Sequence, residues 1–365
     1  MSDGPTGIVL LNMGGPRDLP EVEPFLHRLF KDKELINLPV QNFLGPFLAR
    51  KRLQKVRRNY SEIGGGSPIL KWTEEQGRGM CQRLDSLSPS TAPHYFYTAF
   101  RYAEPLSETA LKAMAHKGVE RAIAFSQYPQ FSCSTTGSSL NELWREVSRL
   151  DLQNKFTWSV IDRWPAHRRF VEAMKETVVE GLNLFPVEAR DDVVIVFSAH
   201  SLPMSVINRG DAYPQEVGAT VHEVMKVLEF SHEYLLAYQS DVGPVPWLGP
   251  STEHVIRALG TKNKKHVLVV GIAFTSDHIE TLHELDIEYG GLAHESGIIN
   301  FYRAPALNGL PIFQDALAEI VLEHLESHDA CTKQYKLRCP GCKNAQCRKI
   351  LNPITPNSCK TKSIY

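Results

Sequence analysis

His200 directly follows a run of apolar residues, in the segment Val196-Phe-Ser-Ala-His-Ser-Leu-Pro203. A histidine at the end of a buried strand is held by rigid backbone and faces the crevice beyond the sheet. Its ordinary pKa of about 6.5 suits proton acceptance at neutral pH. A hydrogen bond within the loop is the competing interpretation, and placement alone does not separate it from a role as a base.

Four acidic residues follow the next strong apolar run: Asp277, Glu280, Glu284 and Glu288. In a helix, spacings of three and four place them on one face, where like charges oppose helix stability. A capping box formed by Asp277 and Glu280 would explain the first two acids. The rest of the row indicates either a path for cations or protons, or a solvated acidic face.

Cysteines cluster near the end of the chain. Of the seven in the sequence, five lie in the last 35 residues, and three of these form the array Cys339-Pro-Gly-Cys-Lys-Asn-Ala-Gln-Cys347. Thiolates at this spacing converge on one metal centre. Cys359 would complete a local zinc site, whereas Cys133 would attach the tail to a strand end in the first half of the chain. Spacing leaves both possibilities open.

The composition is that of an ordinary globular enzyme, with 42% hydrophobic and 22% charged residues. The net charge of -1 gives no reason to expect nucleic acid as a partner. We find no apolar run of about 18 residues, the length that spans a bilayer. About six residues precede the first strand, so a targeting segment is absent from this chain, although one could have been removed earlier.

Alternating apolar runs and amphipathic segments predict an α/β fold with mostly parallel sheets. The strand runs are residues 7–12, 121–125, 193–197 and 266–274; the helical stretches are 107–116, 168–184, 220–230 and 313–324. Two strong strands fall in each half, which indicates two similar lobes that meet near residue 165. Ligands of such sheets sit beyond the carboxyl ends of the strands, which selects residues 13–16, 127–134, 198–203 and 275–280.

Two further segments could shape a binding site. The glycines at residues 14–15 and 64–66 match neither a phosphate loop nor a dinucleotide motif, so we interpret them as turns that bring backbone close to a ligand or another strand. Residues 38–49 are apolar, interrupted by proline and glycine, and followed by Arg50-Lys51-Arg52. Buried loop packing is the default interpretation, and an exposed apolar lip is the alternative.

Taken together, these segments resemble the ferrochelatase family, specifically the animal type that carries a [2Fe-2S] cluster. The resemblance covers nearly the whole chain. It rests on residues 7–16, 63–68, 127–137, 162–165 and 246–250, on the His200 segment extended through Asn208-Arg-Gly-Asp211 and Tyr213, and on the cysteine array. It implies two Rossmann-like lobes with mostly parallel four-stranded sheets, residues 1–165 and 166–330, followed by a cluster-binding extension, residues 331–365.

The resemblance also implies the reaction: insertion of Fe²⁺ into protoporphyrin IX with release of two protons, the terminal step of haem synthesis. His200 would accept the pyrrole protons, with Glu280 opposite, His278 assisting, and Asp277, Glu284 and Glu288 forming a route for protons or metal. His167 is a lesser candidate for acid–base work. Residues expected to bind porphyrin are Met13, Arg52, Tyr60, Ser67, Arg101 and Tyr102.

For the cofactor, the resemblance selects Cys133, Cys339, Cys342 and Cys347 as ligands of a [2Fe-2S] cluster. It further implies a homodimer, peripherally bound to the matrix face of the mitochondrial inner membrane, with residues 38–48 as the membrane-facing lip. A chelatase for another tetrapyrrole and a porphyrin carrier with His200 as axial ligand are the competing hypotheses.

Overall fold

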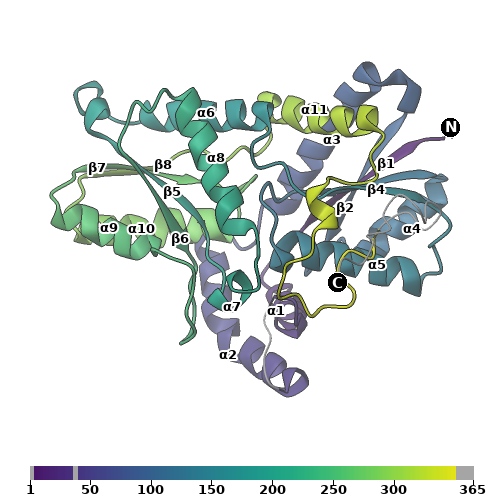
Figure 1. The fold of residues 1–365 in the computed structure, drawn as a ribbon. Helices are drawn as coiled ribbons and strands as arrows, with labels where there is room; N and C mark the ends of the chain where they lie inside the picture. The colour runs from purple at the N-terminus through teal and green to yellow at the C-terminus, as the bar shows by residue number, and fades with distance from the viewer. Residues whose placement is uncertain (1–3, 36–39, 351–365) are drawn as a thin grey trace.

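The computed structural model describes residues 4–35 and 40–350, which form two parallel four-stranded sheets (Figure 1). The first sheet has the order β2-β1-β3-β4 and the second the order β6-β5-β7-β8. Because the strand order follows the same pattern in both, the two predicted lobes share one topology. The strands are β1 Thr6–Asn12, β2 His94–Phe100, β3 Arg121–Ser126, β4 Thr157–Ile161, β5 Val194–His200, β6 Tyr234–Gln239, β7 His266–Gly271 and β8 Asn300–Arg303.

The four strands predicted from apolar runs are β1, β3, β5 and β7, the central strands of the two sheets. Every residue of β1 is buried. A central parallel strand is covered on both faces, so its sequence is continuously apolar. The outer strands are less buried; in β8, for example, all four residues are only partly buried, and the apolar pattern did not reveal them.

Helices cover both faces of each sheet (Figure 1). The predicted helical stretches correspond to α4, α6, the C-terminal part of α8, and α11. The helices of the described residues are α1 Val22–Lys31, α2 Gln41–Glu62, α3 Ile69–Leu87, α4 Ser107–Lys117, α5 Ser138–Arg149, α6 Arg168–Leu182, α7 Met204–Ile207, α8 Tyr213–Val227, α9 Thr252–Thr261, α10 Tyr289–Glu295 and α11 Pro311–Ser327. Shorter or wider turns are η1 Pro89–Thr91, η2 Cys133–Gly137, η3 Val187–Asp192, η4 Glu280–Glu288 and η5 Gln334–Lys336.

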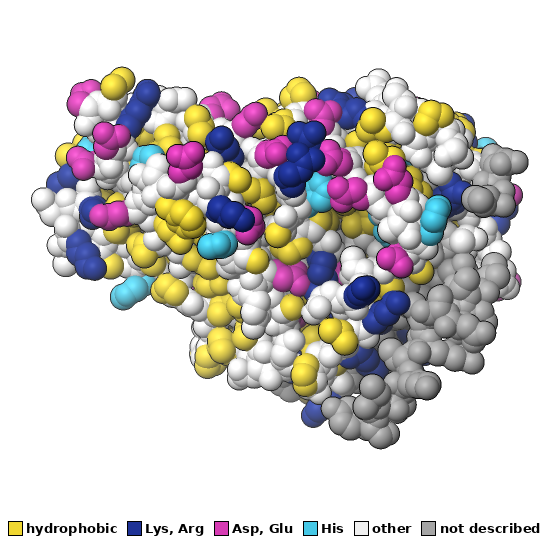
Figure 2. Space-filling view, turned by 45° about the horizontal axis from the view of Figure 1, so that its top comes forward, with side chains coloured by type: hydrophobic (Ala, Val, Ile, Leu, Met, Phe, Trp, Pro, Cys, Tyr) yellow, Lys and Arg dark blue, Asp and Glu magenta, His cyan; other side chains and the backbone are white. Residues whose placement is uncertain are grey.

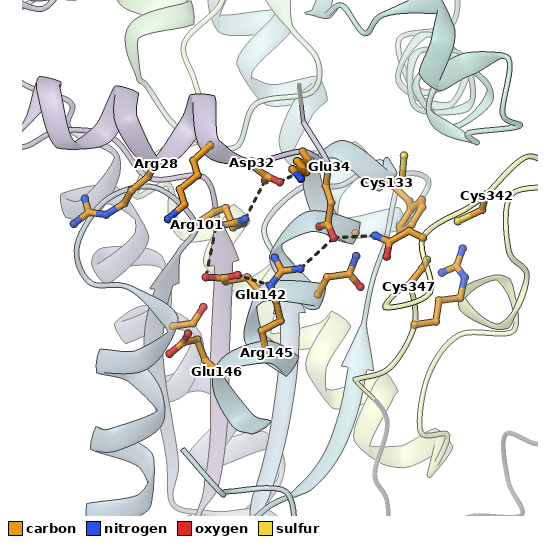
Figure 3. A pocket seen from close by; sticks show the side chains of 18 of the residues that line it. Arg28, Asp32, Glu34, Arg101, Cys133, Glu142, Arg145, Glu146, Cys342 and Cys347 are labelled. Carbon is orange, nitrogen blue, oxygen red and sulfur yellow. Dashed lines mark hydrogen bonds and ion pairs between the residues drawn. The ribbon is translucent and has the colours of Figure 1, made fainter. Parts of the chain in front are cut away.

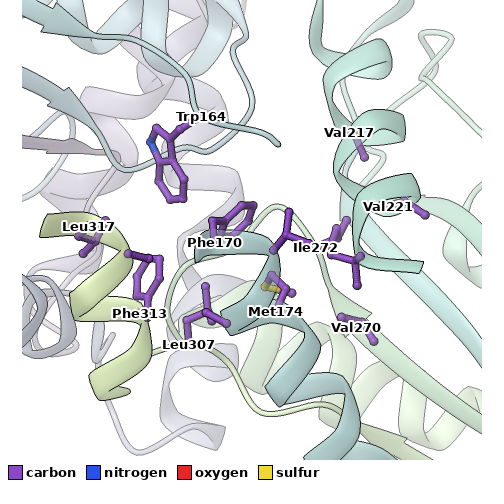
Figure 4. Close-up of a cluster of buried hydrophobic side chains, with 14 of the residues drawn as sticks. Trp164, Phe170, Met174, Val217, Val221, Val270, Ile272, Leu307, Phe313 and Leu317 are labelled. Atoms are coloured by element: carbon purple, nitrogen blue, oxygen red, sulfur yellow. The ribbon is translucent and has the colours of Figure 1, made fainter. Parts of the chain in front are cut away.

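One hydrophobic core joins the two lobes. It includes Ile8 and Phe125 from the first sheet and Phe197 and Leu268 from the second. Figure 4 shows its middle, where Trp164 lies near Phe170 of α6 and Phe313 of α11, and side chains from α8 and β7 extend the cluster on the other side of α6. The Trp164 ring stands edge-on to Phe170, with 4.9 Å between centroids. The sheets are therefore separate, but the side chains between them are packed as one body.

The end of the described chain returns to the first lobe. Helix α11 packs against α3 and α6, and the following segment pairs with the edge strand β4, where the Val160 amide donates to the Ala330 carbonyl at 2.8 Å. Tyr335 and Ile350 are buried there. In Figure 2, which turns the α6 and α11 side forward, acidic and basic side chains are interspersed. Between these two helices, Arg168 and Arg169 both pair with Glu319 at 2.8 Å.

The apolar segment 38–49 is helical in its described part and exposes one side, although Gln41, Gly45 and Ala49 are buried, so the default interpretation as a buried loop is wrong. Residues 38 and 39 lie outside the described residues. From Gln41 onward the segment forms the start of α2, where Phe43 is 77% and Phe47 61% exposed. Gly45 permits close contact with α1, since a Cβ there would lie 2.7 Å from the Phe30 carbonyl oxygen. Among the described residues, no helix is long and apolar enough to cross a membrane.

Candidate active site

The end of strand β5 fixes the position of His200. In the parallel ladder, His200 is opposite Gln239, the last residue of β6, and the Ser201 amide donates to the Gln239 carbonyl at 2.7 Å. His200 is partly exposed at the carboxyl edge of the second sheet, where ligands of parallel sheets bind. The predicted strand-end placement of His200 is confirmed.

The imidazole of His200 has a defined orientation. Its Nδ1 atom lies 2.6 Å from the Ser201 carbonyl oxygen. Because a carbonyl oxygen only accepts hydrogen bonds, Nδ1 carries the hydrogen. In the neutral ring, Nε2 is then left with a lone pair that can accept a proton. The sequence left open whether His200 forms a loop hydrogen bond or acts as a base. In the structure the two are compatible, because the hydrogen bond to Ser201 fixes the tautomer in which Nε2 can accept a proton.

Gln239 connects this histidine to the acidic row. Its amide nitrogen donates to the Glu280 carbonyl at 3.0 Å and to the Glu284 carboxylate at 2.9 Å, while its Oε1 accepts from Ser198 at 2.8 Å. The acidic row is therefore attached to the end of β6, the strand that pairs with β5 at His200. Sequence reasoning missed Gln239, because nothing about a glutamine at a strand end identifies it as a link between segments 40 residues apart.

The acidic row lies on a π-helix, Glu280–Glu288, and not on the α-helix assumed from its spacing. π-helical turns are rare and frequently occur at functional sites. The Glu280 side chain is 15% exposed and that of Glu288 45% exposed. Glu284 accepts from Ser240 and, at 3.2 Å, from Tyr289. These three carboxylates lead from the interior to the surface.

Glu280 is paired with His278. The Nε2 atom of His278 lies 3.1 Å from Glu280 Oε2, and its Nδ1 lies 2.9 Å from the Ser276 carbonyl. Apart from the contact with His278, Glu280 Oε2 is buried without a hydrogen bond to the described residues. A buried carboxylate oxygen in this state is suited to accept a proton or contact a cation.

Asp277 does not continue the row and forms no capping box with Glu280. Its carboxylate pairs with Arg303 at 3.1 Å and accepts from Asn308 at 2.8 Å and Thr281 at 3.0 Å. Its backbone amide donates to the Asn308 side chain, which takes the place that a Glu280 cap would occupy. The four contacts make Asp277 an anchor of the π-helix.

The first lobe brings Met13, Tyr60 and Tyr128 to the same region. Met13 and Ile279, the neighbour of Glu280, both pack against the cluster that contains Tyr60. Burial, and then the charge of Glu280, raise the pKa of Tyr60 and of Tyr128. Tyr128 follows β3 at the carboxyl edge of the first sheet, inside a segment selected by sequence, but the residue itself was not singled out.

The remaining porphyrin-binding candidates are more dispersed. Tyr102 is buried and donates to Asp32 at 2.7 Å. Arg101 pairs with Asp32 at 3.2 Å and with Glu142 at 3.6 Å. Arg52 is exposed on α2, with its guanidinium 6.0 Å from the centre of the Phe30 ring. Ser67 lies against the Gly14-Gly15 turn, since its amide donates to the Pro16 carbonyl at 2.7 Å. The two glycine turns therefore pack on each other.

His167 lies at the start of α6 and faces α11, away from the strand ends. Its Nε2 is 3.3 Å from Glu323, and ligand atoms of His167, Glu319 and Glu323 all lie within 4.8 Å of one another. The structure does not bring His167 together with His200 and Glu280 through any contact among the described residues.

The four predicted cluster cysteines line one cavity of about 750 Å³ between α1, α5 and the tail (Figure 3). Cys133 comes from η2, and Cys339, Cys342 and Cys347 from the tail. Arg209 donates to Cys133 Sγ at 3.5 Å and Arg338 to Cys342 Sγ at 3.8 Å. Burial raises the pKa of Cys347 to about 11. The tail cysteines and Cys133 thus meet, while Cys359 lies outside the described residues.

The opposite wall of this cavity carries paired charges that the sequence did not indicate. Arg145 pairs with Glu34 at 3.2 Å and with Glu142 at 2.7 Å. Asn344, between two of the tail cysteines, donates to Glu34 at 2.8 Å. These contacts hold the cysteine-bearing tail against α5 and the segment after α1 (Figure 3).

Comparison with solved structures first identifies the fold. The solved structure "SirB from Bacillus subtilis with Fe3+" aligns with a TM-score of 0.51 at 12% identity, covering 89% of this chain and 98% of that chain. At this identity, the likeness concerns the fold alone.

The ferrochelatase family model matches residues 5–325, and the chain belongs to this family. Two relatives named "Ferrochelatase, mitochondrial" are those of Xenopus laevis, 57% identical over 94% of this chain and 84% of the relative, and of Homo sapiens, 54% identical over 96% and 83%. The chain is thus a metal chelatase of haem synthesis, which inserts iron into protoporphyrin.

Proposed function

We propose that Fe²⁺ enters protoporphyrin IX at the strand ends described above, with His200 as the acceptor of the pyrrole protons. The observation that carries this role is the 2.6 Å contact between His200 Nδ1 and the Ser201 carbonyl, because it leaves Nε2 as the basic atom. Release of two protons per porphyrin requires such an acceptor beside the ring, and a histidine imidazole is the commonest general base in enzymes.

Glu280 and His278 form the opposing polar group in this proposal. The incompletely paired Oε2 of Glu280 supports a role in receiving a proton or contacting the incoming Fe²⁺. Glu284 and Glu288 supply further carboxylates toward the surface. Asp277 serves this route indirectly, by holding the start of the π-helix through Arg303 and Asn308. Met13, Tyr60 and Tyr128 supply the apolar and phenolic wall for the macrocycle.

The proposal keeps four further residues as porphyrin contacts, and the structural support differs among them: Arg52, Ser67, Arg101 and Tyr102. Arg52 and Ser67 offer a free cation and a hydroxyl that suit propionates. The guanidinium of Arg101 and the hydroxyl of Tyr102 are both engaged with Asp32, so these two would contribute by shaping the pocket. His167 has no contact with the other groups of the site and is the weakest member of the set.

For the cofactor, we propose that Cys133, Cys339, Cys342 and Cys347 hold a [2Fe-2S] cluster. Four cysteine thiolates are the usual ligand set of such a cluster, and all four of these residues line the same cavity. The cluster would join the tail to the first lobe.

The membrane assignment rests on the start of α2. The exposed side chains of Val40, Phe43 and Phe47 stand beside Arg50 and Lys51, a combination that suits peripheral binding to an anionic bilayer. Together with the relatives' mitochondrial names, it supports a location at the matrix side of the inner membrane. The homodimer stays a prediction from the family resemblance, to be tested by sedimentation.

The decisive experiment follows protoporphyrin fluorescence after anaerobic addition of Fe²⁺ to the wild type and to His200→Ala. Fluorescence should fall with the wild type and remain with the variant. Equal loss in both would remove His200 from the mechanism, and no loss with a folded, cluster-replete wild type would refute the function. Co²⁺ and Zn²⁺ in place of Fe²⁺ test the hypothesis of a chelatase for another metal.

A second experiment tests the cluster. Cys133→Ser should abolish the visible charge-transfer absorption and the EPR signal of the reduced protein, whereas Cys359→Ser should leave both unchanged. The reverse result would favour a local site in the tail.

A further inference from the structure

The segment from Arg209 to Tyr213 lies between the tail cysteines and His200. Gly210 has a φ of +90°, and a Cβ there would stand 2.5 Å from Cδ of Pro340. The Gly341 amide donates to the Arg209 carbonyl at 3.0 Å. The turn Cys339-Pro-Gly-Cys342 therefore rests directly on this segment, with no room for a side chain at position 210.

Asp211 ties the same segment to Cys133. Its carboxylate is buried, with the residue 2% exposed. One oxygen, Oδ2, accepts from the Cys133 amide at 2.8 Å and from Ser132 Oγ at 3.2 Å. The other, Oδ1, accepts from the Tyr213 amide at 3.1 Å. A single carboxylate thus joins the first lobe's cysteine to the start of α8 in the second lobe.

Tyr213 completes the connection. It is buried, and its hydroxyl donates to the backbone carbonyl of His200 at 3.0 Å. The next residue, Ser201, supplies the carbonyl that fixes the His200 tautomer. Consecutive hydrogen bonds therefore run from Cys133 through Asp211 and Tyr213 to the backbone of His200.

We infer that Asp211 and Tyr213 are positioning residues that couple the cysteine site to His200, so that a metal group held by the four sulfurs steadies the proton acceptor. This inference rests on the proposed roles of His200 and the cysteines. Sulfurs fixed to a common centre hold the Cys133 backbone and the Cys339–Cys342 turn, and these two contacts hold the segment from Arg209 to Tyr213. When the sulfurs are released, the carbonyl of His200 loses its fixed partner.

The first test removes only the hydroxyl of Tyr213. In Tyr213→Phe, the visible absorption of the cluster and the Kd for protoporphyrin should match those of the wild type, whereas kcat should fall about five-fold, the effect of one lost hydrogen bond. The pH midpoint of kcat should also move, because the backbone that carries the base is altered. Tyr302→Phe is the matched control: Tyr302 is a partly buried tyrosine of the same lobe, packed edge-on against Phe185, and should keep wild-type kinetics.

The second test measures coupling without turnover. Diethyl pyrocarbonate modifies accessible neutral imidazoles, and the rate at His200 is obtained by subtracting the trace of His200→Ala. In the wild type, chelator-depleted and cluster-replete proteins should differ in this rate at least three-fold. In Tyr213→Phe, the difference should shrink to less than half of that, because the connection is already broken.

Two results would overturn the inference: wild-type kcat and pH midpoint in Tyr213→Phe, or an equal effect of depletion on His200 in both proteins. General loosening on depletion would give the second result and counts against the coupling. Absence of metal insertion in the wild type would instead refute the proposed function. If the wild type inserts iron and Tyr213→Phe has the same kinetics, the coupling alone would be refuted.

Discussion

The imidazole of His278 lies 3.1 Å from the carboxylate of Glu280, at the start of the π-helix. The His278 ring is itself fixed by the Ser276 carbonyl and by an edge contact with Phe274. Glu280 is held through its own carbonyl, which accepts from Gln239. The His278 ring and the Glu280 backbone are therefore each held in place, so that Nε2 of the ring faces the carboxylate.

Replacement of Glu280 by glutamine should lower kcat for iron insertion about 100-fold or more, because general acid–base groups contribute about 10²–10⁴ in rate. The amide keeps the shape but neither binds a proton at neutral pH nor attracts a cation. Stopped-flow fluorescence of protoporphyrin measures the rate. Glu295→Gln, at an exposed acid after the π-helix, should keep wild-type activity; similar losses in both would point to a general electrostatic effect.

Arg163 should be important for stability, because it is a buried cation between two carboxylates. It lies 2.6 Å from Asp162 and also pairs with Glu216. Arg163→Met leaves both acids without a cation, although each keeps one hydrogen bond, and should reduce the free energy of unfolding by about 3–5 kcal/mol. Urea unfolding followed by circular dichroism measures this. Arg257→Met, at an exposed pair with Glu253, should change stability by less than about 0.5 kcal/mol.

His324 should make the protein less stable in mild acid. It is on α11 and bonds to Ser159 of β4 at 2.8 Å; burial lowers its pKa from 6.5 to about 4. Between these values the unfolded chain binds the proton and the folded chain does not, so stability falls as pH falls from 6.5. The loss should approach about 3 kcal/mol near pH 4.

The measurement for His324 is the difference in unfolding free energy between the wild type and His324→Gln from pH 7 to pH 4. Glutamine keeps a hydrogen-bonding group but does not titrate. The unfolding free energy of the wild type should therefore fall relative to that of the variant as the pH is lowered. A difference that is constant across this range would contradict the assignment.

The contact between the two glycine turns predicts opposite effects of one substitution at two places. In Gly66→Ala, the new Cβ would lie 2.0 Å from the Arg17 carbonyl oxygen, so the turns must separate and the melting temperature should fall by several degrees. In Gly218→Ala, within α8, the Cβ meets nothing within 4 Å, and stability should rise by about 0.5–1 kcal/mol. Calorimetry distinguishes the two; a stable Gly66→Ala protein would mean that the turns are not closely packed.

The central strands and the polar residues at their ends could be predicted because burial on both faces leaves a continuous apolar run. The predicted ends of β5 and β7 led directly to His200 and to the acidic row. Strand β8 is short and only partly buried, so it gives no continuous apolar run. Strand β6 has the apolar sequence Tyr-Leu-Leu-Ala-Tyr-Gln but was not predicted. Gln239 at its end is buried, and it was missed because nothing about a glutamine marks it as a link between distant segments.

The type of helix that carries the acidic row was also beyond reach. Residues at spacings of three and four predict an α-helix, but the observed turn is π-helical, and Asp277 leaves the row to bind Arg303 of β8. That choice depends on a strand more than 20 residues away in the chain. The exposure of Phe43 and Phe47 was likewise undecided, since the same apolar letters suit a buried loop.

By itself, the sequence determined the α/β class, the family and the residues able to do chemistry, because these depend on local composition, spacing and motif. Only the tertiary structure decided how those residues are joined. Two sets of hydrogen bonds unite segments that are distant along the chain. One runs from Cys133 through Asp211 and Tyr213 to His200. The other runs from Gln239 to Glu280 and Glu284. Hydrogen bonds of this kind need atoms within about 3 Å, and that proximity arises only when the sheets, the π-helix and the tail have packed around one core.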